Sequence, residues 1–199
     1  GSIGPDGAGK SSLLKSCSGV MSFEGSAKFM DRDLKRDPES IKRHLSFMPQ
    51  GLGLNLYAEL SVEENIDFFA AIKDVPVRQR DALKNRLLRI TGLLPFRERY
   101  AKHLSGGMKQ RVAIARALAN QPLIIFADEP TGNLDSKSAL EIISILNQLN
   151  SQGTTIVMVT HELDLAEQAS RIITLRDGCI VSDEKRRPAA VAVARDVMR

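Results

Sequence analysis

The chain has 199 residues, of which 43% are hydrophobic and 26% are charged, and its formal net charge is +4. These values are typical of one globular domain, and they exclude a disordered, collagen-like or coiled-coil protein. Two cysteines and an aromatic content of 5% exclude a disulfide scaffold, a four-cysteine zinc site and an aromatic platform for single-stranded nucleic acid. No apolar run reaches the roughly 18 residues of a transmembrane helix, so we expect any membrane role to come through a partner.

The first half of the chain is predicted to form a helix at 11–18, a short strand at 27–30, a polar irregular segment at 32–40, a strand at 45–48, and helices at 62–72 and 78–90. Apolar residues at three- and four-residue steps indicate that the last two helices are amphipathic. Ser61 followed by Glu64 is the pattern of a capping box at the start of the first of them. Strand signals are absent between 50 and 104, which predicts a helical insert.

The second half is predicted to contain a helix at 107–120, a strand at 123–126, a helix at 138–149, a strand at 154–160, a helix at 162–169 and a strand at 172–175. Asp177-Gly178 then indicates a turn into a final strand around 180–182. The strands at 123–126 and 154–160 are continuously apolar, as expected for strands that are buried on both faces. This alternation of strands and helices predicts an α/β fold with a parallel sheet flanked by helices.

A glycine-rich stretch precedes the first predicted helix. Residues 4–11 read Gly-Pro-Asp-Gly-Ala-Gly-Lys-Ser and match the phosphate-binding motif G-x-x-x-x-G-K-[ST] at every fixed position. Glycines allow backbone N–H groups to point at a phosphate, and the start of the helix favours negative charge. Lys10 would reach the β- and γ-phosphates, and the Ser11 hydroxyl would bind Mg²⁺. The motif predicts a nucleotide-binding site but not a particular function.

Two carboxylates follow the buried strand at 123–126. Ligands bind at the carboxyl ends of parallel strands, and this is where Asp128 and Glu129 are expected. Asp128 would hold Mg²⁺ and Glu129 would be the general base that activates water. Without the phosphate-binding motif, two capping carboxylates would be the simpler interpretation.

A third motif resembles a known family. Leu104-Ser105-Gly106-Gly107-Met108 resembles the LSGGQ signature of ATP-binding-cassette (ABC) ATPases, with Met108 in place of the usual glutamine. The resemblance implies that the helix starting here faces the γ-phosphate held by another subunit. It also matches Gln50 to the glutamine that senses Mg²⁺ and water, Asp135 to the dimer seam, and His161 to the switch histidine. Without the other motifs, a structural residue at a strand end would be the simpler interpretation of His161.

The resemblance implies the P-loop NTPase fold and a complete set of site residues. The expected catalytic residues are Gln50, Glu129 and His161. The residues expected to bind ATP are Gly4, Pro5, Asp6, Gly7, Ala8, Gly9, Lys10, Ser11, Ser12, Ser105, Gly106, Gly107 and Asp135. The residues expected to bind Mg²⁺ are Ser11, Gln50 and Asp128.

The resemblance also implies a division of the chain. Residues 1–50 and 105–184 are expected to form the ATP-binding core, 51–104 a helical subdomain, and 185–199 a basic tail. Family members carry a longer segment before the phosphate-binding motif, with an adenine-stacking aromatic residue and a central strand. We therefore expect the N-terminal strands to be missing from this chain, which would be a fragment or a truncated domain that binds ATP weakly.

The function implied by the resemblance is that of the ATPase subunit of an ABC transporter. ATP would close a head-to-tail dimer with an identical or different cassette, at the cytoplasmic face of a membrane. A transmembrane partner would dock near Gln50 and the helical insert. Residues 129–136 look like macrolide-export and lipoprotein-release cassettes, and 48–53 look like ribosome-associated or drug-export cassettes. The alternative is a soluble ABC ATPase that acts on ribosomes or DNA, although nucleic acid is not an expected partner.

Overall fold

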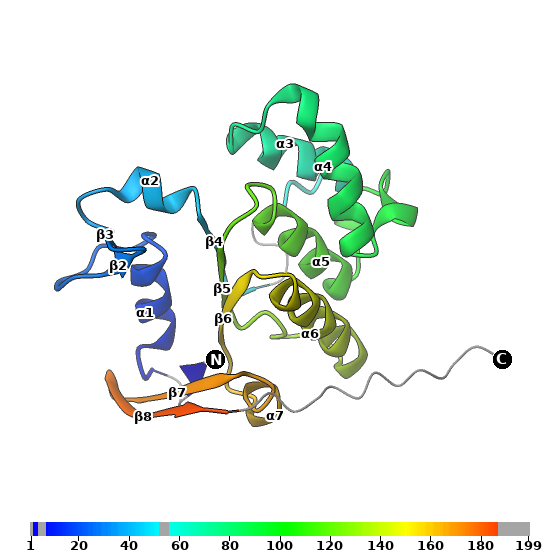
Figure 1. The fold of residues 1–199 in the computed structure, drawn as a ribbon. Coiled ribbons are helices and arrows are strands. Elements are labelled where there is room, and N and C mark those ends of the chain that lie inside the picture. The colour runs from blue at the N-terminus through cyan, green and yellow to red at the C-terminus, as the bar shows by residue number, and fades with distance from the viewer. Residues whose placement is uncertain (1, 4–6, 52–55, 187–199) are drawn as a thin grey trace. The chain divides into compact units, whose positions relative to one another are not determined.

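The computed structural model describes residues 2–3, 7–51 and 56–186 (Figure 1). The chain divides into two compact units. The large unit comprises residues 11–158, and the small unit joins residues 1–10 to residues 159–199. Within the described residues, no helix is long and apolar enough to cross a membrane.

The sheet of the large unit has the strand order β4-β5-β6. Strand β4 (Leu45–Met48) runs parallel to β5 (Ile124–Asp128), with Leu45 opposite Ile124 and Met48 opposite Ala127. Residues 125–128 are buried, in agreement with the prediction of a strand covered on both faces. Strand β6 (Thr155–Val159) is less covered than predicted, because only its last residue is buried.

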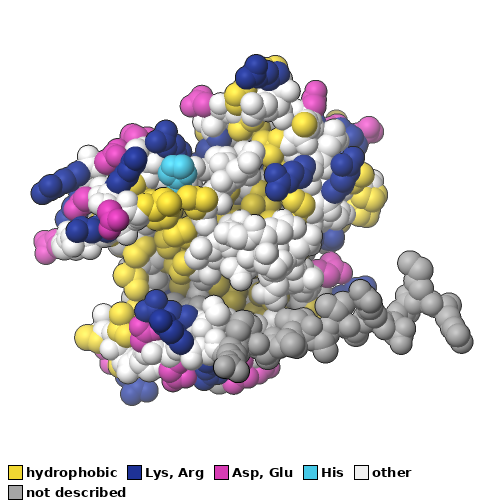
Figure 2. Space-filling model, viewed as in Figure 1, with side chains coloured by type: hydrophobic (Ala, Val, Ile, Leu, Met, Phe, Trp, Pro, Cys, Tyr) yellow, Lys and Arg dark blue, Asp and Glu magenta, His cyan; other side chains and the backbone are white. Residues whose placement is uncertain are grey.

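The segment from 10 to 42 contains more regular structure than its polar sequence indicates. Helix α1 (Lys10–Cys17) is followed by β2 (Lys28–Phe29), β3 (Arg32–Asp33) and α2 (Pro38–Lys42). Met30 and Asp31 both have positive φ, 48° and 62°, and they turn β2 into its antiparallel partner β3. The prediction of an irregular segment at 32–40 is therefore wrong. Figure 2 shows hydrophobic side chains gathered on the surface around α1.

Two helices and two short 3-10 turns make up the described part of the helical insert. These are α3 (Val62–Ile72), α4 (Val77–Ile90), η1 (Leu94–Phe96) and η2 (Ala101–His103). The predicted capping box is confirmed, because Glu64 N–H donates to Ser61 Oγ at 3.2 Å and Ser61 N–H donates to Glu64 Oε2 at 2.7 Å. Buried Ile66 and Leu88 anchor the two helices.

Helix α5 (Gly106–Ala117) lies between the insert and the sheet of the large unit, and α6 (Ser136–Ser151) packs against α5. Helix α5 contacts α3, α6 and β4, and Figure 1 shows it between α3 and α6. Its central residues Val112, Ile114 and Ala115 are fully buried. This burial explains why α5 tolerates the low helix propensity of its first two residues, Gly106 and Gly107, because tertiary packing supplies most helical stability.

The small unit contains β1 (Ser2–Ile3), α7 (Leu163–Ala166), β7 (Arg171–Arg176) and β8 (Cys179–Lys185). Strand β1 runs parallel to β7, and Ser2 also pairs with Val159 at the end of β6. Ser2 and Ile3 thus form a strand that leads into the phosphate-binding motif, and the expectation that this strand is missing is wrong. The predicted turn at Asp177-Gly178 is confirmed, since both residues have positive φ and join antiparallel β7 and β8.

Candidate nucleotide-binding site

The described part of the phosphate-binding motif adopts a backbone that requires glycine. Gly7 and Gly9 have φ of 80° and 85°, in the left-handed region that side chains disfavour. Ala8 between them is buried, and its carbonyl accepts a hydrogen bond of 3.2 Å from Gly178 N–H in the β7–β8 turn. The predicted residues Gly4, Pro5 and Asp6 lie outside the described residues.

Helix α1 begins at Lys10, directly after this loop. The Lys10 residue is only 6% exposed, which is unusual for a lysine unless its charge is paired. The N-terminus of a helix favours anions because its first N–H groups are unbonded and its dipole is positive there. These features fit a terminal phosphate. Ser12 lies one residue beyond Ser11 on the same helix and is exposed.

Ser11 and Asp128 are in direct contact in the large unit. The Ser11 hydroxyl donates to Asp128 Oδ1 at 2.8 Å, although the two residues are 117 positions apart. Asp128 is the last residue of β5 and is 1% exposed. A hydroxyl and a carboxylate brought together in this way are hard oxygen ligands of the kind that Mg²⁺ prefers. The donor set therefore fits the predicted metal.

Gln50 and Glu129 form a second pair. Gln50 Nε2 donates to Glu129 Oε2 at 2.7 Å. The two residues meet because β4 and β5 are paired in parallel and each side chain follows the carboxyl end of its strand. Glu129 has φ of 48°, a left-handed conformation that is strained in a residue with a side chain. Strain of this kind concentrates at functional sites. A hydrogen bond of 3.0 Å from Gly132 N–H to the Glu129 carbonyl stabilises the left-handed conformation of Glu129.

The predicted signature residues and Asp135 lie at two helix N-termini in the large unit. Ser105 is the N-cap of α5 and accepts the Met108 N–H at 3.3 Å. Asp135 is the N-cap of α6 and accepts the Ser138 N–H at 3.0 Å and the Ser138 hydroxyl at 2.7 Å. The hydrogen bonds from Ser138 hold the pKa of Asp135 below its ordinary value.

His161 lies in the small unit, beyond the end of β6, and is exposed. It follows Thr160, whose buried hydroxyl accepts the Glu162 N–H at 3.0 Å. The structure thus brings the predicted residues together as Ser11 with Asp128 and Gln50 with Glu129. Ser105 and Asp135 lie at the starts of two other helices of the large unit.

The sequence did not predict a cavity that lies beside Gln50. A cavity of about 230 Å³ lies between β4, α3 and α5 in the large unit. Its lining residues are Ser46, Phe47, Met48, Pro49, Gly51, Phe69, Lys73, Ala113, Arg116 and Ala117. The Arg116 guanidinium lies 3.4 Å from the centre of the Phe69 ring, and burial lowers the pKa of Arg116 to about 10. No sequence pattern links these residues, because they meet only through tertiary packing.

A phosphate-binding loop that opens a helix, together with a serine–aspartate pair at the end of a buried strand, defines a P-loop nucleoside triphosphatase. Comparison with known proteins narrows this class. The family model described as ABC transporter matches residues 1–132. The chain therefore belongs to the ABC transporter family and is an ABC ATPase domain with the P-loop NTPase fold.

Two relatives illustrate this membership. The macrolide export ATP-binding/permease protein MacB of Bdellovibrio bacteriovorus is 42% identical over 203 residues, which cover 98% of this chain and 30% of the relative. An uncharacterised ABC transporter ATP-binding protein of Methanocaldococcus jannaschii is 43% identical over 185 residues, which cover 90% of this chain and 82% of that protein. The chain thus spans 30% of the length of this MacB relative.

Solved structures agree with the fold. The ATP-binding cassette MJ0796, described as a dimeric bacterial ABC transporter cassette, superimposes with a TM-score of 0.81 at 36% identity and covers 94% of this chain and 85% of that chain. A dimeric post-hydrolysis state of the same cassette, bound to ADP and Pi, gives a TM-score of 0.80 at 35% identity with the same coverage.

Proposed function

We propose that the chain binds and hydrolyses ATP to power an ABC transporter, as one half of a head-to-tail dimer that encloses the nucleotide. The observation that carries this proposal is the contact between Gln50 and Glu129 at 2.7 Å, one residue beyond the buried Asp128. A carboxylate that is oriented by an amide donor beside a metal ligand is suited to take a proton from water. The relatives include transporter ATP-binding proteins, which favours transport over a soluble role on ribosomes or DNA.

The residues of the candidate site have separate roles in the proposed reaction. The N–H groups around Gly7 and Gly9 bind phosphate oxygens, and Lys10 neutralises their charge. Ser11, Asp128 and Gln50 would hold Mg²⁺, which would supply further charge neutralisation on the phosphates. Gln50 donates through Nε2 to Glu129, so its amide oxygen remains available as a ligand. Glu129 accepts the proton of the attacking water, and His161 contacts the γ-phosphate.

A second cassette completes the site in this proposal. Ser105, Gly106 and Gly107 at the start of α5 bind the nucleotide held by the other copy, and Asp135 lies at the seam between the two. Support comes from MJ0796, which has been solved as a dimer and in a state bound to ADP and Pi. The second cassette is either an identical chain or a related one.

The transmembrane partner is proposed to dock at the cavity between β4, α3 and α5. The cavity is lined both by residues beside Gln50 and by Phe69 and Lys73 of the insert. We infer that residues 51–104 act as a subdomain distinct from the core at 1–50 and 105–184. Phe69 offers an apolar surface there, and Arg116 and Lys73 supply positive charge. A partner docked at this position would sense changes around Gln50. The proposal places the chain at the cytoplasmic face of a membrane.

Phosphate release by the purified chain with ATP and Mg²⁺ tests this function. Lys10→Ala should abolish release because the phosphate charge loses its partner, whereas the fold should remain intact by circular dichroism. Lys15→Ala is the matched control, since Lys15 lies in the last turn of the same helix, outside the predicted site. Equal release by the Lys10→Ala variant and the parent chain would contradict the proposal.

A further inference from the structure

Helix α5 approaches α6 closely at one residue. Gly107 is buried, and a Cβ atom added to it would lie 2.8 Å from Ser138 Oγ and 2.9 Å from Ser138 Cβ. Both distances are shorter than van der Waals contact, so a side chain at position 107 would force the two helices apart. The φ of Gly107 is not in the left-handed region, so the need for glycine here is one of space.

The residue that meets Gly107 also holds Asp135. Ser138 donates its N–H to one carboxylate oxygen of Asp135 at 3.0 Å and its hydroxyl to the other at 2.7 Å. Both oxygens are thereby engaged by one residue, which fixes the orientation of the carboxylate. Ser138 therefore contacts the start of α5 on one side and the N-cap of α6 on the other.

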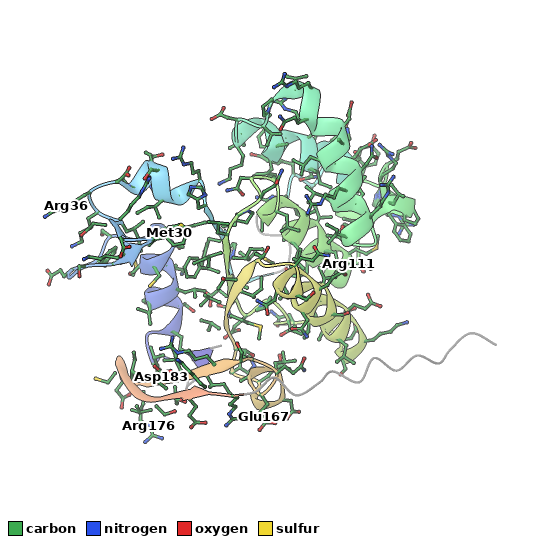
Figure 3. The ribbon with its side chains drawn as sticks, viewed as in Figure 1. Met30, Arg36, Arg111, Glu167, Arg176 and Asp183 are labelled. Atoms are coloured by element: carbon green, nitrogen blue, oxygen red, sulfur yellow. The ribbon has the colours of Figure 1, made fainter. Side chains whose placement is uncertain are left out.

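A second contact shows how the two helices run. Arg111 and Glu141 form an ion pair of 3.7 Å, and each lies about one turn beyond Gly107 and Ser138 respectively. Figure 3 marks Arg111 on α5 beside α6. Because successive contacts advance in the same direction along both helices, α5 and α6 lie side by side with their N-termini at the same end.

We infer that Ser138 is a positioning residue that fixes the N-terminus of α5 against Asp135, so that Ser105, Gly106 and Gly107 face the nucleotide of the second cassette together with Asp135. This inference rests on the proposed function. Ser138 contacts no reacting group itself and acts through the two segments that it joins.

A complementation experiment tests the inference. Gly107→Ala introduces the clash, and Gly107→Ala combined with Ser138→Gly removes both atoms that cause it. Gly107→Ala alone should lose about tenfold in ATP hydrolysis. The pair should recover only part of this loss, because it relieves the clash but lacks the Ser138 hydroxyl that holds Asp135. Ser138→Gly alone should also hydrolyse ATP more slowly than the parent chain, for the same reason. Gly107→Ala combined with Ser138→Ala should stay low, because the Cβ atom at 2.9 Å remains.

A readout independent of ATP hydrolysis is amide hydrogen exchange at Met108, whose N–H is bonded to Ser105 Oγ. Exchange should accelerate in Gly107→Ala and return toward the parental rate in the pair with Ser138→Gly. Ser144→Gly is the matched control, since Ser144 is an exposed serine of the same helix, and combining it with Gly107→Ala should restore neither readout.

Failure of Ser138→Gly to restore the exchange rate of Met108 in the Gly107→Ala chain would overturn the inference. Hydrolysis of ATP at the parental rate by Ser138→Gly alone, in a parent chain that hydrolyses ATP, would also overturn it, because this variant lacks the hydroxyl that is inferred to orient Asp135. A parent chain that releases no phosphate would instead contradict the proposed function, and the exchange measurement would still decide whether Ser138 fixes the start of α5.

Discussion

Glu129→Gln removes the proposed general base with the smallest change in shape. The amide retains an oxygen that can accept the hydrogen bond from Gln50 Nε2, which is 2.7 Å long in the parent chain. Glutamine also has the same backbone requirements as glutamate, so the positive φ of 48° at this position adds no new strain. Stability should therefore change little. An amide cannot take a proton, and removal of a general base lowers rates by about 10²–10⁴, or about 3–5 kcal/mol in the activation barrier.

Phosphate release under saturating ATP and Mg²⁺ measures this loss, and nucleotide binding is measured separately with a fluorescent ATP analogue. Binding should survive because Lys10, Ser11 and Asp128 are unchanged. The variant should also accumulate as an ATP-bound dimer in size-exclusion chromatography, with ADP as the negative control. Glu59→Gln is the matched control, since Glu59 is an exposed carboxylate paired with Lys102, and it should hydrolyse ATP at the parental rate. Hydrolysis by Glu129→Gln at the parental rate would refute the base role and direct attention to His161.

Three further predictions concern the loop and the helical insert. Gly9→Ala places a side chain at φ of 85°, which costs about 1–2 kcal/mol. A free loop that relaxes from this conformation must return to it to bind phosphate, so ATP affinity measured by titration calorimetry should fall roughly fivefold to thirtyfold; an unchanged affinity would contradict the loop geometry. Ile66→Ala, in the fully buried core of α3, should lower the free energy of unfolding in urea by about 2–5 kcal/mol, whereas Ile72→Ala at an exposed site should change it by less than about 0.5 kcal/mol. Ser61→Ala should lower the melting temperature through a loss of about 1 kcal/mol, because the Glu64 N–H loses its acceptor Ser61 Oγ, and an unchanged melting temperature would contradict the capping box. The Ser61 N–H and hydroxyl hold the pKa of Glu64 below its ordinary value, so the stability contributed by Glu64 is present above that ordinary pKa and is lost as the pH falls through the lowered pKa.

The regular elements of the large unit were largely predictable because each carries its own local pattern. The apolar steps of 62–72 match α3, and the Ser61 and Glu64 pair marks where that helix begins. Local patterns failed where structure depends on tight turns. Met30 and Asp31 form a hairpin turn in a left-handed conformation without any glycine. Residues 38–42 form a short helix that begins with Pro38 and buries only Ile41.

The residues of the candidate site were predictable from local sequence, but the contacts between them were not. Ser11, Asp128 and Glu129 were predicted one by one, because phosphate and metal chemistry demands particular residue types at fixed spacings, and Gln50 was predicted from the family resemblance. The pairing of Gln50 with Glu129 depends on the register between β4 and β5, and the pairing of Ser11 with Asp128 depends on the contact of α1 with β5; no local pattern encodes either. Ser138 carried only a weak signal, as the third residue after a capping aspartate. Its contact with Gly107 arises from the packing of α6 against α5, which the local sequence of either helix does not encode.

The central claim is that the ATP site is shared between two copies of the cassette. It is tested most directly by mixing two inactive chains, Lys10→Ala and Ser105→Arg, and measuring phosphate release. Each variant alone should be inactive, because every dimer then lacks either the phosphate contact or an open signature helix. Mixed dimers contain one site with an intact loop from the Ser105→Arg chain and an intact α5 N-terminus from the Lys10→Ala chain. The account predicts that the mixture recovers hydrolysis well above the sum of the separate variants, and a mixture no more active than that sum would contradict it.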